Sequence, residues 1–294
     1  MKKRSGPEIF GMSINTIILF LLAFSTTYPF WHVMMYSISD SRAAMSGGLF
    51  FIPREPTLLA YQMLFKTRLI FIVYRNTIIR TVAGTFLSLL ISALTAYPLS
   101  LNRFKGRSFF AMMIFFTMLF SGGMIPTYLV VRNLGLLDTM WALILPGAMS
   151  AYNMFILRNY FKSIPDSLEE SALLDGANPL QVLFLIILPL SAPALAAIAM
   201  FYGVGNWNSY LDGVLYINST DRQILQVYLR TMLGTAGAKG VLGDISGNLS
   251  DASSLTEETM KMVTITVSII PVLIVYPFLQ KYYTKGILIG SVKG

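Results

Sequence analysis

The stretch that decides the fold reads IPDSLEESALLDGANPLQVLFLIILPLSAP and runs from Ile164 to Pro193. Ser167 and Glu170 have the spacing of a capping box, which predicts the start of a short helix. Gly176 stands where a left-handed residue would end that helix, and Asn178-Pro179 has the cap and first-residue pattern that starts the next one. The sequence therefore predicts a helix, a sharp turn and a second helix.

The corner between these two helices is apolar. If the two short helices lie at right angles to the long apolar segments beside them, they present Leu173, Leu174 and Ala177 at the corner. Such a corner suits insertion into a groove of another protein. A helix that lies on a lipid surface is the alternative.

The composition around this stretch is that of a membrane protein. The chain has 294 residues, of which 55% are hydrophobic and 12% are charged, and its mean hydropathy is +0.64. An ordinary soluble domain carries roughly 25% charged residues. So few charges would leave large apolar patches exposed to water, and we expect lipid to cover them.

Six windows without charged residues predict six transmembrane helices, because a span needs about 20 mostly apolar residues. Pro189 and Pro193 interrupt the fifth window, so we expect its span to begin near Pro193, after a separate amphipathic piece. The predicted spans are 12–38, 76–101, 108–131, 139–158, 192–212 and 262–281.

The charge pattern predicts the orientation of the chain. An even number of spans puts both termini on one side, and the basic residues favour the cytoplasm for that side. The net charge of +8 is not accompanied by basic stretches interleaved with aromatics, so nucleic acid is not expected as a partner. With no cysteine and one histidine, we expect neither thiolate chemistry nor a metal site.

The segment after residue 164 resembles the EAA loop of binding-protein-dependent ABC importer permeases. Glu170-Ser171-Ala172, Asp175-Gly176 and Ile186-Ile187-Leu188-Pro189 stand at the offsets of that motif. The one departure is Ser171, which replaces the first alanine and is nearly isosteric with it.

This resemblance implies the all-α integral membrane fold of a type I ABC importer permease, with six transmembrane helices. A single permease domain would cover residues 1–294, with a cytoplasmic coupling loop at 164–189 between the fourth and fifth helices. In such importers the loop docks in a cleft of an ATPase, and closure of two ATPase subunits around ATP drives the membrane domains from inward-facing to outward-facing. Glu170 is then expected to pair with a basic residue of the ATPase, with helix capping alone as the alternative. The positions assigned to ATPase coupling are Glu170, Ser171, Ala172, Leu173, Leu174, Asp175, Gly176, Ala177 and Pro189.

The C-terminal segment from Gln280 resembles the tail of the smaller permease subunit of maltose-type carbohydrate importers. In that subunit the tail reaches between the two ATPase subunits. The resemblance implies a cytoplasmic tail at 282–294 with ATPase contacts at Lys285, Gly286 and Gly290. A solvated basic end, anchored by the positive-inside rule, is the alternative.

Polar and aromatic residues near the end of the fifth predicted span are candidates for the substrate path. Amides can bind hydroxyl groups and an indole can stack on a sugar ring, whereas an interfacial aromatic belt is the alternative. The candidates are Asn206, Trp207, Asn208 and Tyr210, with Asn76 as a weaker one. No charge lies in the core of any window, which argues against proton relays and buried ion pairs and favours a neutral solute at this point.

The sequence is thus interpreted as one permease subunit of an ATP-driven importer in a bacterial inner or plasma membrane. The implied partners are a second homologous permease, two ATPase subunits, an extracytoplasmic binding protein, membrane lipid and an oligosaccharide. Basic residues such as Arg222 and Arg230 would suit docking of the binding protein or an acidic sugar, since related subgroups import alginate or pectin fragments. The chain has no phosphate loop, so ATP and magnesium are expected in the partners and no cofactor in this chain.

Other functions remain as alternatives. An importer permease for a non-sugar solute would share these features. A membrane-embedded enzyme would need a catalytic constellation at membrane depth, and no such motif is visible. A secondary transporter would need broken helices and a coupling-ion site, for which Pro29 and Gly203-Val204-Gly205 are weak signs.

Overall fold

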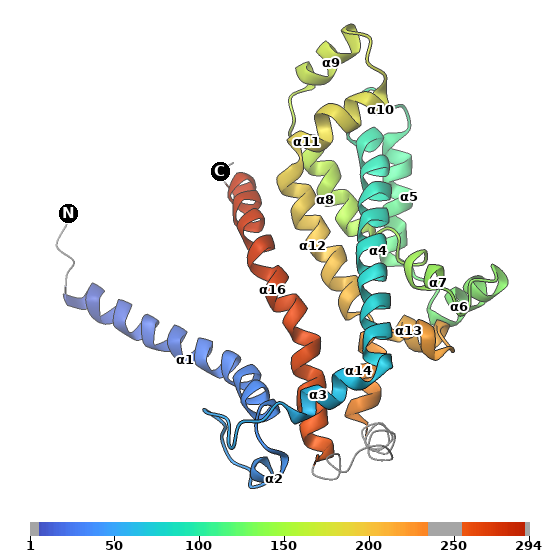
Figure 1. Ribbon diagram of the computed structural model, residues 1–294. Helices are drawn as coiled ribbons and strands as arrows, with labels where there is room; N and C mark the ends of the chain where they lie inside the picture. Colours follow the sequence, from blue (N-terminus) through green and yellow to red (C-terminus); the bar gives the residue numbers. More distant parts are fainter. Residues whose placement is uncertain (1–5, 235–254, 292–294) are drawn as a thin grey trace. The chain divides into compact units, whose positions relative to one another are not determined.

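The computed structural model describes residues 6–234 and 255–291, with side chains for 10–234 and 255–277. Within these residues the secondary structure is helical, with one isolated bridge between Ser39 and Pro56 (Figure 1). The chain divides into two compact units, of which one joins Met1–Arg68 to Leu229–Ile270 and the other joins Leu69–Tyr228 to Pro271–Gly294.

The first unit is built on a long apolar helix. Tyr36, in the last turn of that helix, forms a small buried cluster with Ala44 and Phe50, and Ser37 Oγ lies 2.7 Å from Tyr61 Oη. Most of the large apolar side chains of the helix between Phe10 and Phe24 are exposed, as expected for a segment that lipid covers. Its described helices are α1 (Gly6–Ser37), α2 (Ser41–Ala44), α3 (Leu59–Lys66) and the first part of α16 (Glu257–Ser291).

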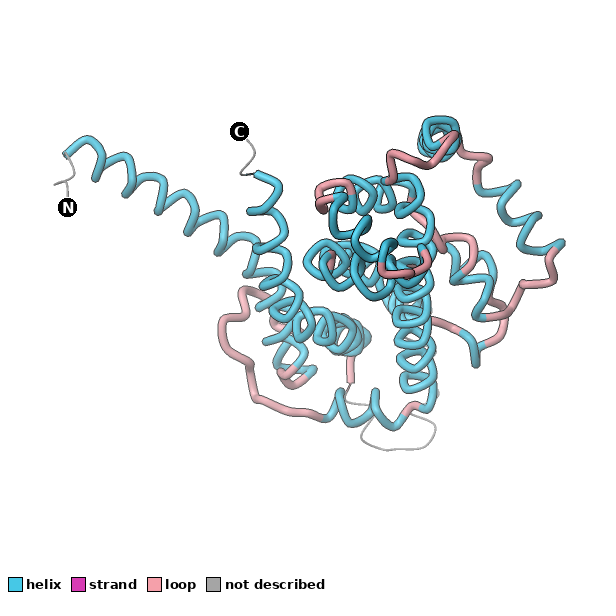
Figure 2. The backbone as a smooth tube through the Cα atoms, turned by 90° about the horizontal axis from the view of Figure 1, so that it is seen from above, coloured by secondary structure: helices cyan, strands magenta, loops and turns pink. Residues whose placement is uncertain are grey.

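The second unit is a helical bundle with short helices at both ends. Figure 1 shows α4, α5, α8 and α12 side by side, with α9 and α10 at one end and α6, α7 and α13 at the other. Figure 2 shows the bundle nearly end-on. Its helices are α4 (Arg68–Ser100), α5 (Arg107–Leu119), α6 (Met124–Asn133), α7 (Met140–Ile144), α8 (Ala151–Phe161), α9 (Asp166–Leu174), α10 (Pro179–Val182), η1 (Leu183–Ile187), α11 (Leu188–Leu190), α12 (Ala192–Asn208), α13 (Leu211–Tyr216), η2 (Thr220–Arg222) and α14 (Leu225–Leu233), which continues into the first unit.

Small residues and hydroxyl groups hold the bundle together. Ala93 and Ala96 of α4 are buried in the main core with Leu157 of α8 and Ile198 of α12. Small side chains let membrane helices approach closely, where dispersion contacts and hydrogen bonds replace the hydrophobic effect. Tyr202 supplies the hydrogen bonds, because its hydroxyl lies 2.7 Å from Ser92 Oγ and accepts from the backbone N–H of Ser150 at 3.0 Å.

The fifth predicted span is interrupted where its prolines predict. Pro179–Leu190 and Ala192–Asn208 form two apolar helical segments that meet at an angle of 85°. Pro193 occupies the first turn of α12, where its missing N–H costs nothing. The structure thus has a separate helical piece before α12 and begins α12 at Ala192, whereas the bounds of the span stay a prediction.

Helix lengths do not settle the number of spans. Among the described residues, three helices are long and apolar enough to cross a membrane, or up to five if each bent pair is one span. Arg107–Leu119 and Met124–Asn133 form the other bent pair, with an angle of 113°. The predicted span 139–158 falls on two helices, α7 and α8. The six spans therefore stay a prediction.

A buried ion pair contradicts the expectation that the bundle holds none. Arg80 of α4 pairs with Asp212 at the start of α13, and the side chain of Arg80 is 3% exposed. The Asp212 carboxylate also accepts from Ser209 Oγ at 2.8 Å and from the backbone N–H of Gly213 at 2.9 Å. The expectation was wrong because it rested on windows without charged residues, whereas α4 includes Arg80, and a partner 132 residues away neutralises that charge.

We expect Asp212→Asn to destabilise the protein by about 3 kcal/mol, the lower end for breaking a buried pair, because water reaches the carboxylate but not Arg80. The thermal unfolding midpoint in detergent measures this change. Asp138→Asn is the matched control, since Asp138 and Arg222 form a pair whose side chains are 32% and 52% exposed, and its midpoint should shift less. Equal shifts in the two variants would contradict the assignment of a buried charge.

Candidate functional site

The helix that precedes the turn starts earlier than predicted. α9 begins at Asp166, its N-cap is Pro165, and no side chain caps its first turn. Ser167 lies inside the helix, so the predicted capping box of Ser167 and Glu170 is wrong. Acidic residues in the first turn, Asp166 and Glu169, favour the helix start through the helix dipole instead.

The turn itself has the predicted chemistry. Gly176 has a φ of +87°, its N–H donates to the Leu173 carbonyl at 3.1 Å, and the N–H of Ala177 donates to the Ala172 carbonyl at 3.0 Å. These two bonds form a Schellman motif, which closes a helix through a left-handed residue. Asn178 then caps α10, and its capping box with Gln181 has bonds of 2.8 and 2.9 Å. The predicted helix, turn and helix are confirmed.

The predicted corner residues face in different directions. Leu174 is 89% exposed, whereas Leu173 and Ala177 pack against the main core. Of the other residues assigned to coupling, Ala172 is buried and Glu170, Ser171, Asp175, Gly176 and Pro189 are exposed. The corner therefore offers Leu174 and Glu170 to a partner and uses Leu173 and Ala177 for its own support.

Glu169 is a residue of this site that the sequence analysis missed. It is 8% exposed, and its Oε1 accepts from Tyr97 Oη at 2.8 Å and from Arg103 Nη2 at 2.5 Å. Tyr97 belongs to α4 and Arg103 to the loop that follows α4. The signal was a pair of adjacent glutamates in α9 together with a basic loop, but the sequence does not tell which glutamate turns inward.

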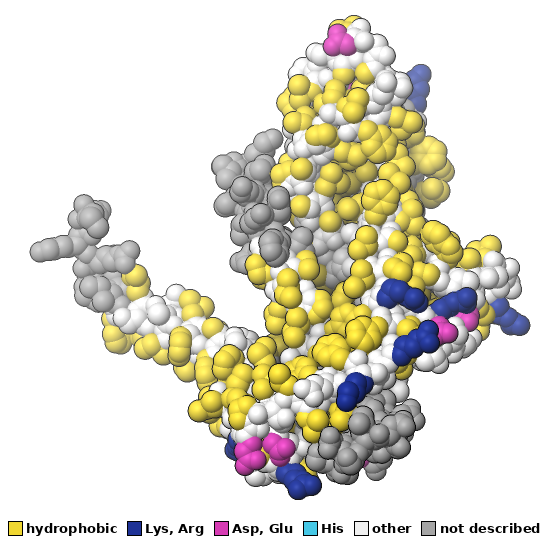
Figure 3. All heavy atoms as spheres, in the orientation of Figure 1, with side chains coloured by type: hydrophobic (Ala, Val, Ile, Leu, Met, Phe, Trp, Pro, Cys, Tyr) yellow, Lys and Arg dark blue, Asp and Glu magenta, His cyan; other side chains and the backbone are white. Residues whose placement is uncertain are grey.

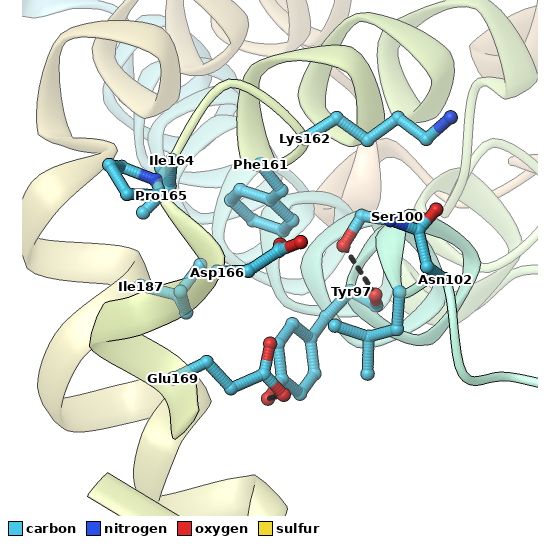
Figure 4. Close-up of a pocket in the computed structure, with 11 residues that line it drawn as sticks. Tyr97, Ser100, Asn102, Phe161, Lys162, Ile164, Pro165, Asp166, Glu169 and Ile187 are labelled. Carbon is cyan, nitrogen blue, oxygen red and sulfur yellow. Dashed lines mark hydrogen bonds between the residues drawn. The ribbon is translucent and has the colours of Figure 1, made fainter. Parts of the chain in front are cut away.

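A polar cavity of about 200 Å³ lies between α9 and the end of α4. Figure 4 shows Asp166 and Glu169 on one side, facing Tyr97 and Ser100 on the other. Ser100 Oγ donates to the Tyr97 carbonyl at 2.6 Å. This cavity leaves room for water around Glu169.

The polar residues at the end of α12 do not form one surface. Trp207 is 9% exposed and packs edge-on against Tyr74, with ring centroids 6.4 Å apart. Asn206 lies against α4, where a Cβ at Gly84 would come within 3.0 Å of its Nδ2. Asn208 is exposed and Tyr210 is half-buried. Only Asn206 and Trp207 thus lie along the contact of α12 with α4.

Unpaired polar atoms gather along this contact. Arg80 Nε, Thr81 Oγ1 and Thr85 Oγ1 of α4, and Trp207 Nε1 of α12, are buried without a hydrogen-bond partner among the described residues. Thr85 Oγ1 lies 3.7 Å from where a Cβ at Gly203 would stand. We call Thr81, Thr85, Asn206 and Trp207 the polar seam. Buried groups of this kind need a partner, so water or a solute is expected to meet them.

Asn76 has a structural task. Its Nδ2 donates to the carbonyl oxygens of Asp221 and Gln223, both at 2.9 Å, and the residue is 3% exposed. It therefore holds the turn after α13 against α4. Its predicted place in the substrate path stays untested.

A second hydrogen-bonded carboxylate, Asp138, lies between α6 and α7 at the other end of the unit. Asp138 Oδ1 accepts from the backbone N–H groups of Asn218 and Ser219 at 3.1 and 3.0 Å and from Ser219 Oγ at 2.8 Å. These hydrogen bonds, foremost those from Ser219, hold the pKa of Asp138 below its usual value, and Arg222 adds to the effect. Arg222, a predicted docking residue, is thus engaged by Asp138 although half of its side chain is exposed.

The predicted ATPase contacts of the tail, at Lys285, Gly286 and Gly290, lie in the last part of α16. α16 continues to Ser291, but the contacts of its residues after 277 lie outside what the structure describes. Within the described part of the chain, no group of three or more His, Cys, Asp or Glu could hold a metal ion.

Known proteins match almost the whole chain. It is 45% identical to the polygalacturonan/rhamnogalacturonan transport system permease protein YtcP of Bacillus subtilis (strain 168), over 98% of this chain and 99% of the relative. It is 42% identical to protein LplC of the same organism, over 92% and 90%. A solved structure, described as the crystal structure of a bacterial ABC transporter involved in the import of the acidic polysaccharide alginate, matches with a TM-score of 0.89 and 36% identity, over 96% of this chain and all of the other.

These matches show the fold and the kind of protein. The helical architecture is that of a type I ABC importer permease, as the resemblance implied. Such chains are transport subunits of the membrane and not enzymes. Residues 85–289 match the family described as binding-protein-dependent transport system inner membrane component, and the chain belongs to this family of ABC importer permeases.

Proposed function

We propose that this permease imports an acidic oligosaccharide. One observation carries the proposal: two relatives that match nearly the whole chain, at 45% and 36% identity, are described by acidic polysaccharides. Polygalacturonan and alginate share a carboxylate on the sugar ring, so the common chemistry is a uronic acid. More distant relatives at 28% identity are named for arabinooligosaccharides, which makes neutral oligosaccharides the competing substrates.

The polar seam supports passage of a sugar. Its hydroxyl, amide and indole groups bind hydroxyls and carboxylates without a fixed charge of their own. Arg80, the residue before Thr81, is neutralised by Asp212. A solute that meets the seam therefore finds donors that hold it weakly, and weak contacts let it leave again.

The proposal includes the usual assembly of such an importer. A second permease completes the path, two ATPase subunits bind ATP and magnesium, and an extracytoplasmic protein delivers the substrate. Both termini and α9 face the cytoplasm in this arrangement. The exposed Leu174 and Glu170 of α9 then meet the ATPase, and the Lys285, Gly286 and Gly290 segment is a further contact.

The substrate is tested with the complete transporter and its binding protein in proteoliposomes. An oligogalacturonide should stimulate ATP hydrolysis and uptake about ten-fold more than its methyl ester of the same length. The charged carboxylate of the sugar accepts stronger hydrogen bonds from the transporter than the neutral ester does. The ester is the matched control, since it keeps the sugar chain and removes only the charges. Equal uptake of the ester, or stronger stimulation by an arabinooligosaccharide, would overturn the acidic substrate.

The two glutamates of α9 are tested against each other. Glu170→Gln should lower substrate-stimulated ATP hydrolysis while leaving the thermal unfolding midpoint unchanged, because Glu170 is exposed. Glu169→Gln should lower both, since it weakens the bonds from Tyr97 and Arg103 by about 1–2 kcal/mol. If Glu170→Gln lowers the midpoint and Glu169→Gln does not, the division of roles is reversed.

A further inference from the structure

An open groove lies on the side of the second unit next to the turn between α9 and α10. Its volume is about 420 Å³, and its walls are the end of α4, the loop after it and the start of α10 and η1. Leu94 and Pro98 form one apolar wall and Leu180 and Leu183 the other, while Arg103 and Lys105 belong to the loop. We call this the basic groove.

The apolar walls select the kind of ligand. Leu94 and Leu180 are exposed, so the groove opens to whatever surrounds the bundle. Figure 3 shows hydrophobic side chains over the flank of α4, which in a protein of the inner membrane is the kind of surface that lipid chains cover. Leu94 stands six residues before the end of α4, which is about 9 Å along the helix and matches the first part of an acyl chain.

The basic residues select the headgroup. Lys105 has no hydrogen-bond or ion-pair partner in the described part of the chain. Arg103 gives one bond to Glu169, and its guanidinium has five N–H donors, so it can also bind a phosphate. Two cations beside an apolar wall favour a headgroup whose phosphate is not offset by an amine.

We propose that the basic groove binds an anionic phospholipid, with its phosphate at Lys105 and Arg103 and one acyl chain along Leu94, Pro98, Leu180 and Leu183. The bound phosphate holds Arg103 in place, and Arg103 in turn holds Glu169 of α9. The lipid thus acts on the helix that carries Glu170 and Leu174, without touching substrate or nucleotide. The binding step does not depend on which substrate the transporter carries.

Native mass spectrometry of the complete transporter tests the binding. The complex is titrated in mild detergent with dioleoyl phosphatidylglycerol or dioleoyl phosphatidylcholine, without substrate or ATP. We expect the wild type to retain phosphatidylglycerol preferentially and Lys105→Gln to lower this retention about five-fold, the effect of one basic residue at a membrane surface. Lys105→Arg should retain it as the wild type does.

Two variants separate the groove from general charge effects. Lys162→Gln removes an exposed lysine that lines the other cavity and should leave retention unchanged. Leu180→Gln should lower retention without unfolding the protein, because Leu180 is exposed. If Lys162→Gln lowers retention as much as Lys105→Gln, or phosphatidylcholine binds equally well, the site does not exist.

A photo-crosslinker in place of Leu180 identifies the occupant directly. Crosslinks to phosphatidylglycerol support the proposal, whereas crosslinks to an ATPase subunit alone show that a protein fills the groove and overturn it.

The effect on α9 is read from ATP hydrolysis in nanodiscs. Phosphatidylglycerol should stimulate the wild type more than Lys105→Gln, and an equal response would refute the link from the lipid to Glu169. A failed acidic-substrate test changes none of these readouts.

Discussion

The buried carboxylate of Glu169 sets the orientation on which the coupling segment depends. Tyr97 and Arg103 both donate to it, and this fixes which face of α9 turns toward the bundle. With Glu169 inward, Ala172 and Leu173 follow it at helical spacing, whereas Glu170 and Leu174, four residues apart, share the outer face. A rotation of α9 by one residue would bury Glu170 and expose Glu169, so two hydrogen bonds decide which glutamate a partner meets.

The turn after α9 was predictable because its chemistry is local. A glycine with positive φ and an Asn-Pro helix start are signals carried within a few residues, and both are found where the sequence placed them. The start of α9 was not predictable in this way. The helix begins at Asp166, directly after Pro165, and not at the predicted cap Ser167. The inward turn of Glu169 depends on Arg103, which lies 66 residues away, and no local pattern reports that distance.

The same limit explains the errors about charge. An apolar window ends at a charged residue whether that residue meets water or a partner, so a search for windows without charge does not report that Arg80 is paired. Its partner Asp212 stands at the end of another predicted span, 132 residues away. Asn76, a weaker candidate for the substrate path, also has contacts that the sequence does not report, because its amide donates to two backbone carbonyls beyond α13. The composition predicted a membrane protein. The pairs Arg80–Asp212 and Arg103–Glu169 join residues far apart in the sequence, so only the structure reveals them.

The positions of the ion pairs Arg80–Asp212 and Arg103–Glu169 explain how a membrane helix can carry a buried charge. Arg80 lies 20 residues before Ser100, the end of α4, which is a rise of about 30 Å, close to the hydrocarbon thickness of a bilayer. Arg103 follows directly after that end, so both pairs stand at the borders of a neutral stretch. Because α4 is one continuous helix, its contacts with Asp212 at one border and with Glu169 at the other tie both ends of this neutral stretch to short helices, α13 and α9.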